Sequence, residues 1–473
     1  MKYSIIKYSG LEKTSMRLDS EYYHPHNLKL LKKLQSKPHL AISSFSFVTD
    51  GIHESIQFDN SSHINLISAK APKENFFDLS GCSNISVTQD KNNPRTRLRK
   101  SDIIVSTVGT IGNCAVVDDS ILPANSDRHV GIIRIKKDFY PRFISSFLLS
   151  KYGRFQTFRE STGNVQLNLF IYKIKEIIVP SFSSTFQLLI EKICLKAADL
   201  NISAINSYCQ AEQTLLSDLD LLDWKPKHRL SFVKNFSDTV FAGRYDAEYF
   251  QPMYEEIVKT VKSSENCVNL DDIISIKKGI EPGREAYQDN GVMFVRVSNL
   301  SKSGFKDGNQ QYVGDDLYRT KQKYQPKQRE ILLSKDGTPG IAYYLKDEPE
   351  RMIPSGGILR LKVNDESKVY PEYLTLVLNS VIVQKQIERD VGGSIINHWL
   401  VDQVKKTLIP VLPVAKQKEI ADTVNESFSN RELSKQLLEI AKRGVELAIE
   451  KDEHQAQKWV DEKLNRIGIT ISK

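Results

Sequence analysis

The feature that most constrains the fold is an internal repeat, because three separate segments of the chain recur at a near-constant distance. The segments are 17–25 and 244–252, 102–112 and 330–340, and 163–180 and 393–410, at separations of 227, 228 and 230 residues. Three matches at nearly one offset are hard to obtain by chance. The sequence therefore predicts two copies of one folded unit, which recognise two copies or two variants of one kind of object.

Composition indicates a globular protein without a membrane span. The 473 residues are 40% hydrophobic and 26% charged, and that length predicts two or three domains. No apolar run reaches the roughly 18 residues of a transmembrane helix. The five cysteines are scattered, and neither a zinc pattern nor a signal peptide is visible. We therefore expect a cytoplasmic protein with reduced thiols.

The net charge of +8 permits a polyanionic partner without proving one. The positive charges gather at the same place in both copies, just before a Gly-Thr loop. They are Arg95, Arg97, Arg99 and Lys100 in the first copy, and Arg319, Lys321, Lys323, Lys327 and Arg329 in the second. Each run alone is typical of a solvated face. Their shared position favours a shared role.

Each copy predicts the same order of elements, so the fold class is mixed α/β. A short helix follows a proline, at 27–35 and at 253–262. Short β-branched runs bounded by turn residues come next, then a helix at 140–149 or 370–378, then a closing strand at 177–180 or 408–410.

A long uninterrupted helix is predicted after each copy, over 184–219 and over 414–451. Apolar residues recur there at steps of three and four, and each helix is about 50 Å long at about 1.5 Å per residue. Each helix packs either on its own unit or on the other helix. The narrow apolar stripes favour an antiparallel coiled-coil pair with a pseudo-two-fold axis.

The Gly-Thr-x-Gly loops, 109–112 and 337–340, follow a strand in both copies. A phosphate-binding loop needs a following Lys-Ser/Thr and a helix, and both are missing. The loops are therefore either plain hairpin turns or carriers of polar side chains that contact base edges and phosphates.

Sites of other kinds are not indicated by the sequence. The repeated Arg-x-Asp-x-Glu at 17–21 and 244–248 precedes a helix and favours structural ion pairs over catalysis. His129 and His398 are not at equivalent positions, and we expect no metal site. No methyltransferase, nucleotide-binding or nuclease motif is visible, so the chain is expected to bind rather than to catalyse.

This architecture resembles the specificity subunit of Type I restriction–modification enzymes, from Arg17 to about Lys451. The segments that carry the resemblance are 222–228, 244–252, 331–340, 392–397 and 409–420, while 162–168 in the first copy is a looser version. The resemblance implies two target recognition domains that read DNA, with the paired helices setting the spacer between half-sites. The implied domains are target recognition domain 1 at 1–181, helix 182–220, connector 221–243, target recognition domain 2 at 244–412, helix 413–452 and a polar tail at 453–473.

The resemblance also implies the partners. They are double-stranded DNA, two methyltransferase subunits and restriction or translocase subunits, in a cytoplasmic phage-defence system without a membrane. S-adenosylmethionine, ATP and Mg²⁺ are expected on those subunits and no cofactor on this chain, which is itself non-catalytic.

The candidate DNA contacts are polar or basic residues of both copies. They are Lys70, Lys73, Arg95, Arg97, Arg99, Ser106, Thr110 and Arg128 in the first copy, and Arg296, Lys302, Arg319, Lys321, Arg329, Lys335 and Thr338 in the second. Two other functions stay open: a coiled-coil scaffold without a DNA role, and a self-contained methyltransferase or nuclease with disguised motifs.

Overall fold

The chain forms two compact units in the structure, which is a computed structural model. It describes residues 5–12, 17–163, 166–306, 310–391 and 397–471. Unit 1 comprises Met1–Ile202 and Arg431–Lys473, and unit 2 comprises Ser203–Asn430. This division differs from the linear series of segments expected from the sequence, because each long helix contributes to both units.

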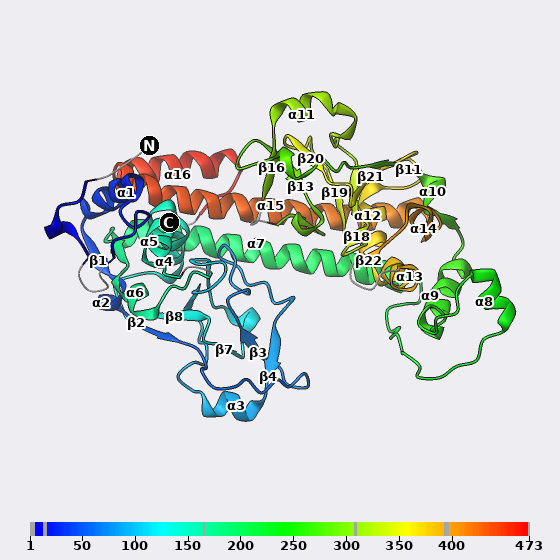
Figure 1. Ribbon diagram of the computed structural model, residues 1–473, viewed down its shortest axis with the longest axis horizontal. Coiled ribbons are helices and arrows are strands. Elements are labelled where there is room, and N and C mark those ends of the chain that lie inside the picture. The colour runs from blue at the N-terminus through cyan, green and yellow to red at the C-terminus, as the bar shows by residue number, and fades with distance from the viewer. Residues whose placement is uncertain (1–4, 13–16, 164–165, 307–309, 392–396, 472–473) are drawn as a thin grey trace. The chain divides into compact units, whose positions relative to one another are not determined.

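Unit 1 is built on a four-stranded antiparallel sheet. Its strand order is β2 (Ser46–Asp50), β8 (Val130–Ile135), β5 (Ile103–Ser106) and β6 (Cys114–Val116). A second sheet has the order β4 (Ser83–Ile85), β3 (Ile64–Ile67) and β7 (Ala124–Ser126), with β3 and β7 parallel (Figure 1). A third, two-stranded sheet pairs β1 (His39–Ala41) with β9 (Ile178–Pro180).

Short helices complete the globular part of unit 1. They are η1 (Tyr8–Gly10), α1 (Pro25–Gln35), α2 (Ile42–Phe45), α3 (Val87–Asn92), η2 (Asp119–Ile121), α4 (Pro141–Leu149), α5 (Lys151–Glu160) and α6 (Ile171–Glu176). α1 and α4 each begin at a proline, which has no backbone N–H to leave unpaired in a first turn.

Unit 2 repeats the main sheet and has a second sheet with one more strand than that of unit 1. Its main sheet has the order β11 (Ile274–Lys278), β21 (Ile358–Val363), β17 (Ile331–Ser334) and β19 (Ala342–Tyr344). The second sheet has the order β12 (Tyr287–Gln288), β16 (Gln311–Val313), β13 (Val292–Val295) and β20 (Met352–Pro354), with β13 and β20 parallel. Three small pairs join β10 (Cys267–Asn269) to β23 (Leu408–Pro410), β14 (Leu300–Ser301) to β15 (Gly304–Phe305), and β18 (Asp336–Gly337) to β22 (Asn397–His398).

The helices of unit 2 follow the same plan, with α8 added before the repeat and further short helices between β11 and β17. They are α8 (Phe236–Ala242), α9 (Pro252–Ser263), α10 (Leu270–Ile273), η3 (Arg284–Ala286), η4 (Val297–Asn299), α11 (Asp315–Thr320), η5 (Gln322–Tyr324), α12 (Pro371–Asn379), α13 (Val381–Asp390) and α14 (Val401–Lys405). The mixed α/β fold and the repeat expected from the sequence are therefore present.

Two long helices, α7 (Ser184–Ser217) and α15 (Val414–Glu450), pair in antiparallel fashion within each unit. In unit 1 the Ser434 hydroxyl donates to the carbonyl of Ala197 at 2.6 Å. In unit 2 the Ser427 hydroxyl donates to the carbonyl of Ala204, also at 2.6 Å. The second contact lies seven residues later on α7 and seven residues earlier on α15, which is a heptad step.

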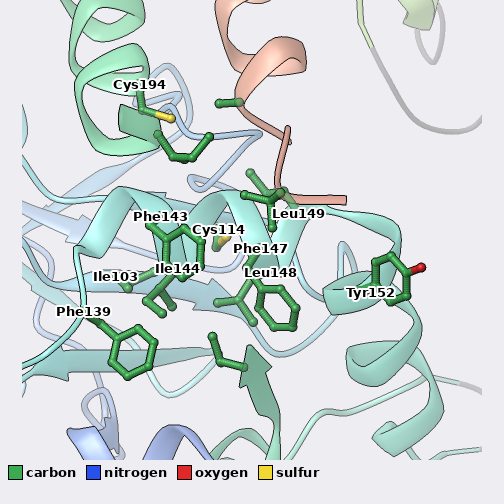
Figure 2. Close-up of a cluster of buried hydrophobic side chains, with 14 of the residues drawn as sticks. Ile103, Cys114, Phe139, Phe143, Ile144, Phe147, Leu148, Leu149, Tyr152 and Cys194 are labelled. Atoms are coloured by element: carbon green, nitrogen blue, oxygen red, sulfur yellow. The ribbon is translucent and has the colours of Figure 1, made fainter. Parts of the chain in front are cut away.

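The same helices also pack on the core of each unit, so the two packings weighed from the sequence occur together. In unit 1, Ile190 and Ile193 of α7 and Val445 of α15 share a core with Phe143 and Phe147 of α4. Figure 2 shows this cluster, with Cys114 and Cys194 among its apolar side chains. In unit 2, Ala211, Leu215, Ile420 and Val424 join the main sheet in an equivalent core.

Buried glutamines connect the same elements in both copies. Gln187 of α7 donates to the carbonyl of Phe182 and accepts from the N–H of Tyr140, which precedes α4. Gln417 of α15 donates to Leu412 and accepts from Tyr370, which precedes α12. Because a buried amide without partners is costly, each glutamine fixes its long helix against one globular part.

The segment expected to be a polar tail instead forms α16 (Glu453–Arg466), in unit 1 (Figure 1). Ala456, Val460 and Leu464 recur at steps of four, are buried, and join the core with α7 and α15. The Cβ that Gly444 lacks would lie 2.8 Å from Val460 and 3.4 Å from Ile190, so the glycine allows this close approach. Three apolar residues on one face are enough to dock a helix whose average composition is polar.

Candidate nucleic-acid interface

The Gly-Thr loops have the same backbone in both units. The N–H of Gly112 donates to the carbonyl of Ser106 at 3.0 Å, and the N–H of Gly340 donates to Ser334 at 2.8 Å. All four glycines have positive φ, from 70° to 91°, which side-chain-bearing residues rarely adopt. The loops are therefore turns with a fixed shape.

Within each loop the two glycines have different surroundings. A Cβ at Gly112 would lie 2.5 Å from the Thr157 hydroxyl, and one at Gly340 would lie 2.4 Å from Ile387. A Cβ at Gly109 or Gly337 would meet no atom within 4 Å among the residues that the structure describes. The second glycine thus seats the loop on a helix, while the first, beside exposed Thr110 or Thr338, faces open space.

A second backbone segment is joined to each loop. In unit 1 the N–H of Thr107 donates to His129, and the N–H of Leu169 donates to Thr107. In unit 2 the N–H of Lys335 donates to Gly357, and the N–H of Trp399 donates to Lys335. The turn before β8 or β21, the loop, and the segment before α6 or α14 therefore meet at one edge of each unit, which we call the loop edge.

The loop edge of unit 2 carries a charged network. The Lys335 ammonium lies 2.5 Å from Asp336 Oδ2, and His398 Nδ1 lies 2.9 Å from Asp336 Oδ1. Burial alone would raise the pKa of Asp336, but the hydrogen bonds from Lys335 and His398 outweigh it and lower that pKa. These residues border an open pocket of about 450 Å³ together with Lys278, Trp399, Leu400, Val401 and Asp402.

The loop edge of unit 1 has different side chains on the same backbone. Thr107 and Val108 stand where unit 2 has Lys335 and Asp336, and Asn168 stands where it has His398. His129, from the turn before β8, pairs with Asp127 at 3.2 Å. Arg128 beside it is exposed and forms no ion pair within the described residues. The two edges therefore present different donors and acceptors.

Of the residues predicted for unit 1, only some are available to a ligand. Ser106 is fully buried and its hydroxyl donates to the carbonyl of Ala69 at 2.8 Å, so it holds the loop instead of facing solvent. Arg95 pairs with Asp50 at 3.0 Å, and Arg97 pairs with Asp90 at 2.6 Å. Lys73 donates to the carbonyl of Lys70, and Thr110 donates to that of Ala69 while staying exposed. Among the basic residues predicted for unit 1, Lys70, Arg99 and Arg128 are exposed and form no ion pair within the described residues.

The residues predicted for unit 2 divide in the same way. Lys302 donates to the carbonyl of Asn379 at the end of α12, and Arg329 pairs with Glu366, its Nε lying 3.0 Å from Oε1. Arg296 is half-buried, and its N–H donates to the Asn299 side chain. Arg319 and Lys321 are exposed and form no ion pair in the described part of unit 2, and Thr338 is exposed on the loop.

The predicted residues do not all lie at one edge, because some precede a strand and others follow it. Arg99 comes before β5, whereas Thr110 comes after it. Arg99, Lys100, Lys136 and Lys137 border a separate open pocket of about 400 Å³, near the end of β8. The structure therefore places Thr110, Arg128, Lys335 and Thr338 at the loop edges, and Arg99 at the other end of its sheet.

An ion pair on each main sheet, fully buried in unit 2, was not predicted from the sequence. In unit 1, Arg134 Nε lies 3.0 Å from Asp102 Oδ1, and in unit 2, Arg360 Nε lies 3.3 Å from Glu330 Oε2. Burial raises the pKa of Asp102, although its contacts with Arg99 and Arg134 oppose that shift. Asp102 corresponds to Glu330 in the repeat, and each arginine lies on the strand beside β5 or β17, Arg134 on β8 and Arg360 on β21. An acidic residue just before the same strand of both copies, with an arginine on the neighbouring strand, is the sequence signal that could have identified these pairs.

The repeated Arg-x-Asp segments form the structural ion pairs expected of them. Arg17 lies 2.6 Å from Asp19, and Arg244 lies 2.6 Å from Asp246. Each carboxylate also accepts a backbone N–H, from Tyr22 or Tyr249, and each guanidinium lies over the ring of that tyrosine, at 4.8 and 4.6 Å from the centroid. The segment is thus a rigid entry to α1 and α9.

The described residues contain no group of three or more His, Cys, Asp or Glu side chains placed to hold a metal ion. Among the helices built from them, none has both the length and the apolar character needed to cross a membrane. The motif residues 392–396 and 164–165 lie outside the part of the chain that is described.

Part of this chain matches a known protein family. Residues 264–443, most of unit 2 and part of α15, match the family of Type I restriction modification DNA specificity domains. That match confirms, over those residues, the resemblance drawn from the motifs. A comparison with curated proteins found no match.

Solved structures similar to this chain include two specificity subunits. One is the S subunit of a Type I restriction–modification system from M. genitalium, 12% identical, covering 89% of this chain and 95% of that chain with a TM-score of 0.38. Another is the HsdS subunit from Thermoanaerobacter tengcongensis, 12% identical, covering 90% and 95% with a TM-score of 0.26.

Proposed function

We propose that this chain is the DNA-recognition subunit of a Type I restriction–modification enzyme and that each unit reads one half of a bipartite DNA site. The observation that carries the proposal is the repeated loop edge, in which one rigid backbone displays different side chains. Rigid polar turns beside exposed cations suit contacts to base edges and phosphates.

The two half-sites differ in sequence under this proposal. Lys335, Asp336 and His398 offer hydrogen-bonding groups and a paired positive and negative charge from Lys335 and Asp336 in unit 2, where unit 1 has Thr107, Val108 and Arg128. Different donor and acceptor patterns select different base pairs in the major groove. The complete site is therefore asymmetric.

The paired helices set the unread spacer between the half-sites in this proposal. Support comes from α7 and α15, each of which contributes residues to both units and pairs at a heptad step within them. A fixed separation between two readers fixes the distance between half-sites, as in dimeric DNA-binding proteins.

The partners are the second part of the proposal. The chain docks two methyltransferase subunits, which carry S-adenosylmethionine and the adenine chemistry, and a restriction or translocase subunit joins them with ATP and Mg²⁺. Support comes from the family match and from the repeat, which offers two equivalent docking places on one chain.

Methylation mapping of a host genome tests the DNA-reading part directly. Lys335→Ala or Thr338→Ala should relax one half-site and leave the other unchanged, whereas Thr110→Ala should change only the other. A scaffold without a DNA role predicts no change in any methylated motif, and joint changes in both half-sites contradict one unit per half-site.

Purified chain alone tests whether catalysis resides elsewhere. Incubated with duplex DNA and labelled S-adenosylmethionine, it should transfer no methyl group until methyltransferase subunits are added. Methyl transfer by the chain alone would show a self-contained enzyme instead.

Arg99 is tested separately, because it lies away from the loop edge. If it contacts a phosphate, Arg99→Ala should weaken binding to all sequences equally and reduce the salt-dependence slope by about one. An unchanged slope removes Arg99 from the interface, and with it the neighbouring basic pocket.

A further inference from the structure

Both loop edges display an exposed apolar side chain at the same position of the repeat. Phe170 is 49% exposed and Leu400 is 63% exposed, although each follows a buried residue, Leu169 or Trp399. Exposing a large apolar side chain at one position is ordinary. Here both equivalent positions of the repeat expose a large apolar side chain, although one is phenylalanine and the other leucine. That coincidence indicates that the two side chains contact a ligand.

The backbone holds both residues next to the Gly-Thr loops. Leu169 donates its N–H to Thr107 at 2.9 Å, and Trp399 donates its N–H to Lys335 at 2.8 Å. The next residue in each case is the N-cap of a short helix, α6 or α14. Phe170 and Leu400 are therefore fixed one residue beyond an anchor on the loop.

The two side chains have different surroundings. The Phe170 ring stacks on Tyr172, with ring centroids 5.7 Å apart and planes 16° apart. The helix that begins after Phe170 lies over Gly131, where a Cβ would meet Ile174 at 2.7 Å and Ile171 at 3.4 Å. Leu400 borders the pocket that contains Lys335, Asp336 and His398.

We propose that Phe170 and Leu400 each contact the 5-methyl group of a thymine in the half-site read by their own unit. The inference rests on the proposed function and deepens it by naming a base feature. The thymine methyl is the apolar group of the major groove, and hydrogen-bonding side chains cannot report it. An apolar side chain beside polar loop residues supplies that missing interaction.

Substrates in which uracil replaces thymine provide the test, because uracil lacks only the methyl group. Full-length chain with its methyltransferase subunits is bound to duplexes that carry the methylated motif, with thymines replaced in one half-site at a time. Wild-type binding should weaken about fourfold when the one contacted methyl group is absent, as expected for the burial of one methyl-sized group. Phe170→Ala should weaken binding to thymine DNA by the same factor. When uracil then replaces thymine in the half-site read by unit 1, this variant should show no further weakening, whereas replacement in the other half-site should weaken it as in the wild type.

The same cycle applies to Leu400→Ala and the other half-site. Phe170→Leu and Leu400→Phe keep an apolar side chain and should retain most of the thymine preference. Two substitutions serve as matched controls. Phe47→Ala removes an exposed phenylalanine from the end of β2 that lies away from the loop edge, and Leu230→Ala removes an exposed leucine from the connector. Both should leave affinity and thymine preference unchanged.

The outcomes separate this inference from the function on which it rests. Sequence-specific binding that is indifferent to uracil, or alanine variants that keep the thymine preference, overturns the thymine contact and leaves the proposed function standing. Alanine variants that bind DNA normally but no longer bind methyltransferase subunits overturn it as well and show a protein-docking role instead. Absence of any sequence-specific binding overturns the proposed function itself.

Discussion

At the scale of single residues, removing one charge from the buried pair Glu330–Arg360 should lower stability strongly. Both side chains are nearly inaccessible, at 3% and 1% exposed, and Glu330 also accepts the N–H of Lys327. Glu330→Gln should lower the free energy of unfolding of unit 2 by about 3–5 kcal/mol, since it leaves a guanidinium buried without its counter-charge. Asp315→Asn, which breaks the exposed pair with Arg351, should cost less than about 1 kcal/mol. Equal effects in chemical denaturation would contradict this account.

Two buried thiols give a pH-dependent prediction at the same scale. Burial raises the pKa of Cys114 and of Cys194 from 9.0 to about 12. The unfolded thiols therefore release their protons first, and the free energy of unfolding should fall as the pH rises through about 9.

Alkylation of the native protein followed by mass spectrometry should label exposed Cys209 and spare both buried thiols until the chain unfolds. Labelling of Cys114 or Cys194 at the rate of Cys209 would show that this core opens readily.

At the scale of elements, the pairing of α7 with α15 depends on small residues at its contacts. Ser434 and Ala197 are both fully buried and joined by a hydrogen bond. Ser434→Leu should overpack this contact and destabilise unit 1 by about 1–3 kcal/mol. The control is Lys435→Leu, since Lys435 follows Ser434 directly but is exposed; this substitution should change thermal stability little. A tolerated leucine at 434 would mean that the helices are not closely packed there.

Several elements could be predicted from the sequence because their signals are local. Pro25, Pro252, Pro141 and Pro371 begin helices, and β-branched runs such as that of β17 form strands. The fates of Arg95 and Arg97 could not be predicted, because their partners Asp50 and Asp90 are brought to them by folding. The burial of Ser106 was missed because β5 continues through it, and α16 was missed because its three apolar contacts are diluted by polar neighbours.

At the scale of the whole molecule, the heptad step predicts how the DNA spacer responds to helix length. Seven residues inserted into α7 after Ile202 and seven into α15 before Arg431 preserve the pairing register. They lengthen the helices by about 10 Å at about 1.5 Å per residue. Under the proposed function the spacer should grow by about three base pairs at about 3.4 Å each. Methylation mapping should show both half-sites unchanged, and an unaltered spacer would show that the helices do not set it.

Inserting seven residues into only one helix is the control for that experiment. It leaves one partner too short, so Ser427 and Ser434 cannot both reach their carbonyls on α7. The protein should then lose stability instead of acquiring a new spacer. A longer spacer from the single insertion would argue against pairing as the ruler.

The split composition of unit 1 imposes an order on biosynthesis. Unit 2 is continuous in the chain, whereas the core of unit 1 needs Val445 and Val460, which leave the ribosome after all of unit 2. Unit 1, whose synthesis begins first, is thus completed last. Its apolar core surface stays exposed until α16 has been synthesised. A premature stop near residue 452 would therefore damage the beginning of the protein, far from the lesion in the gene.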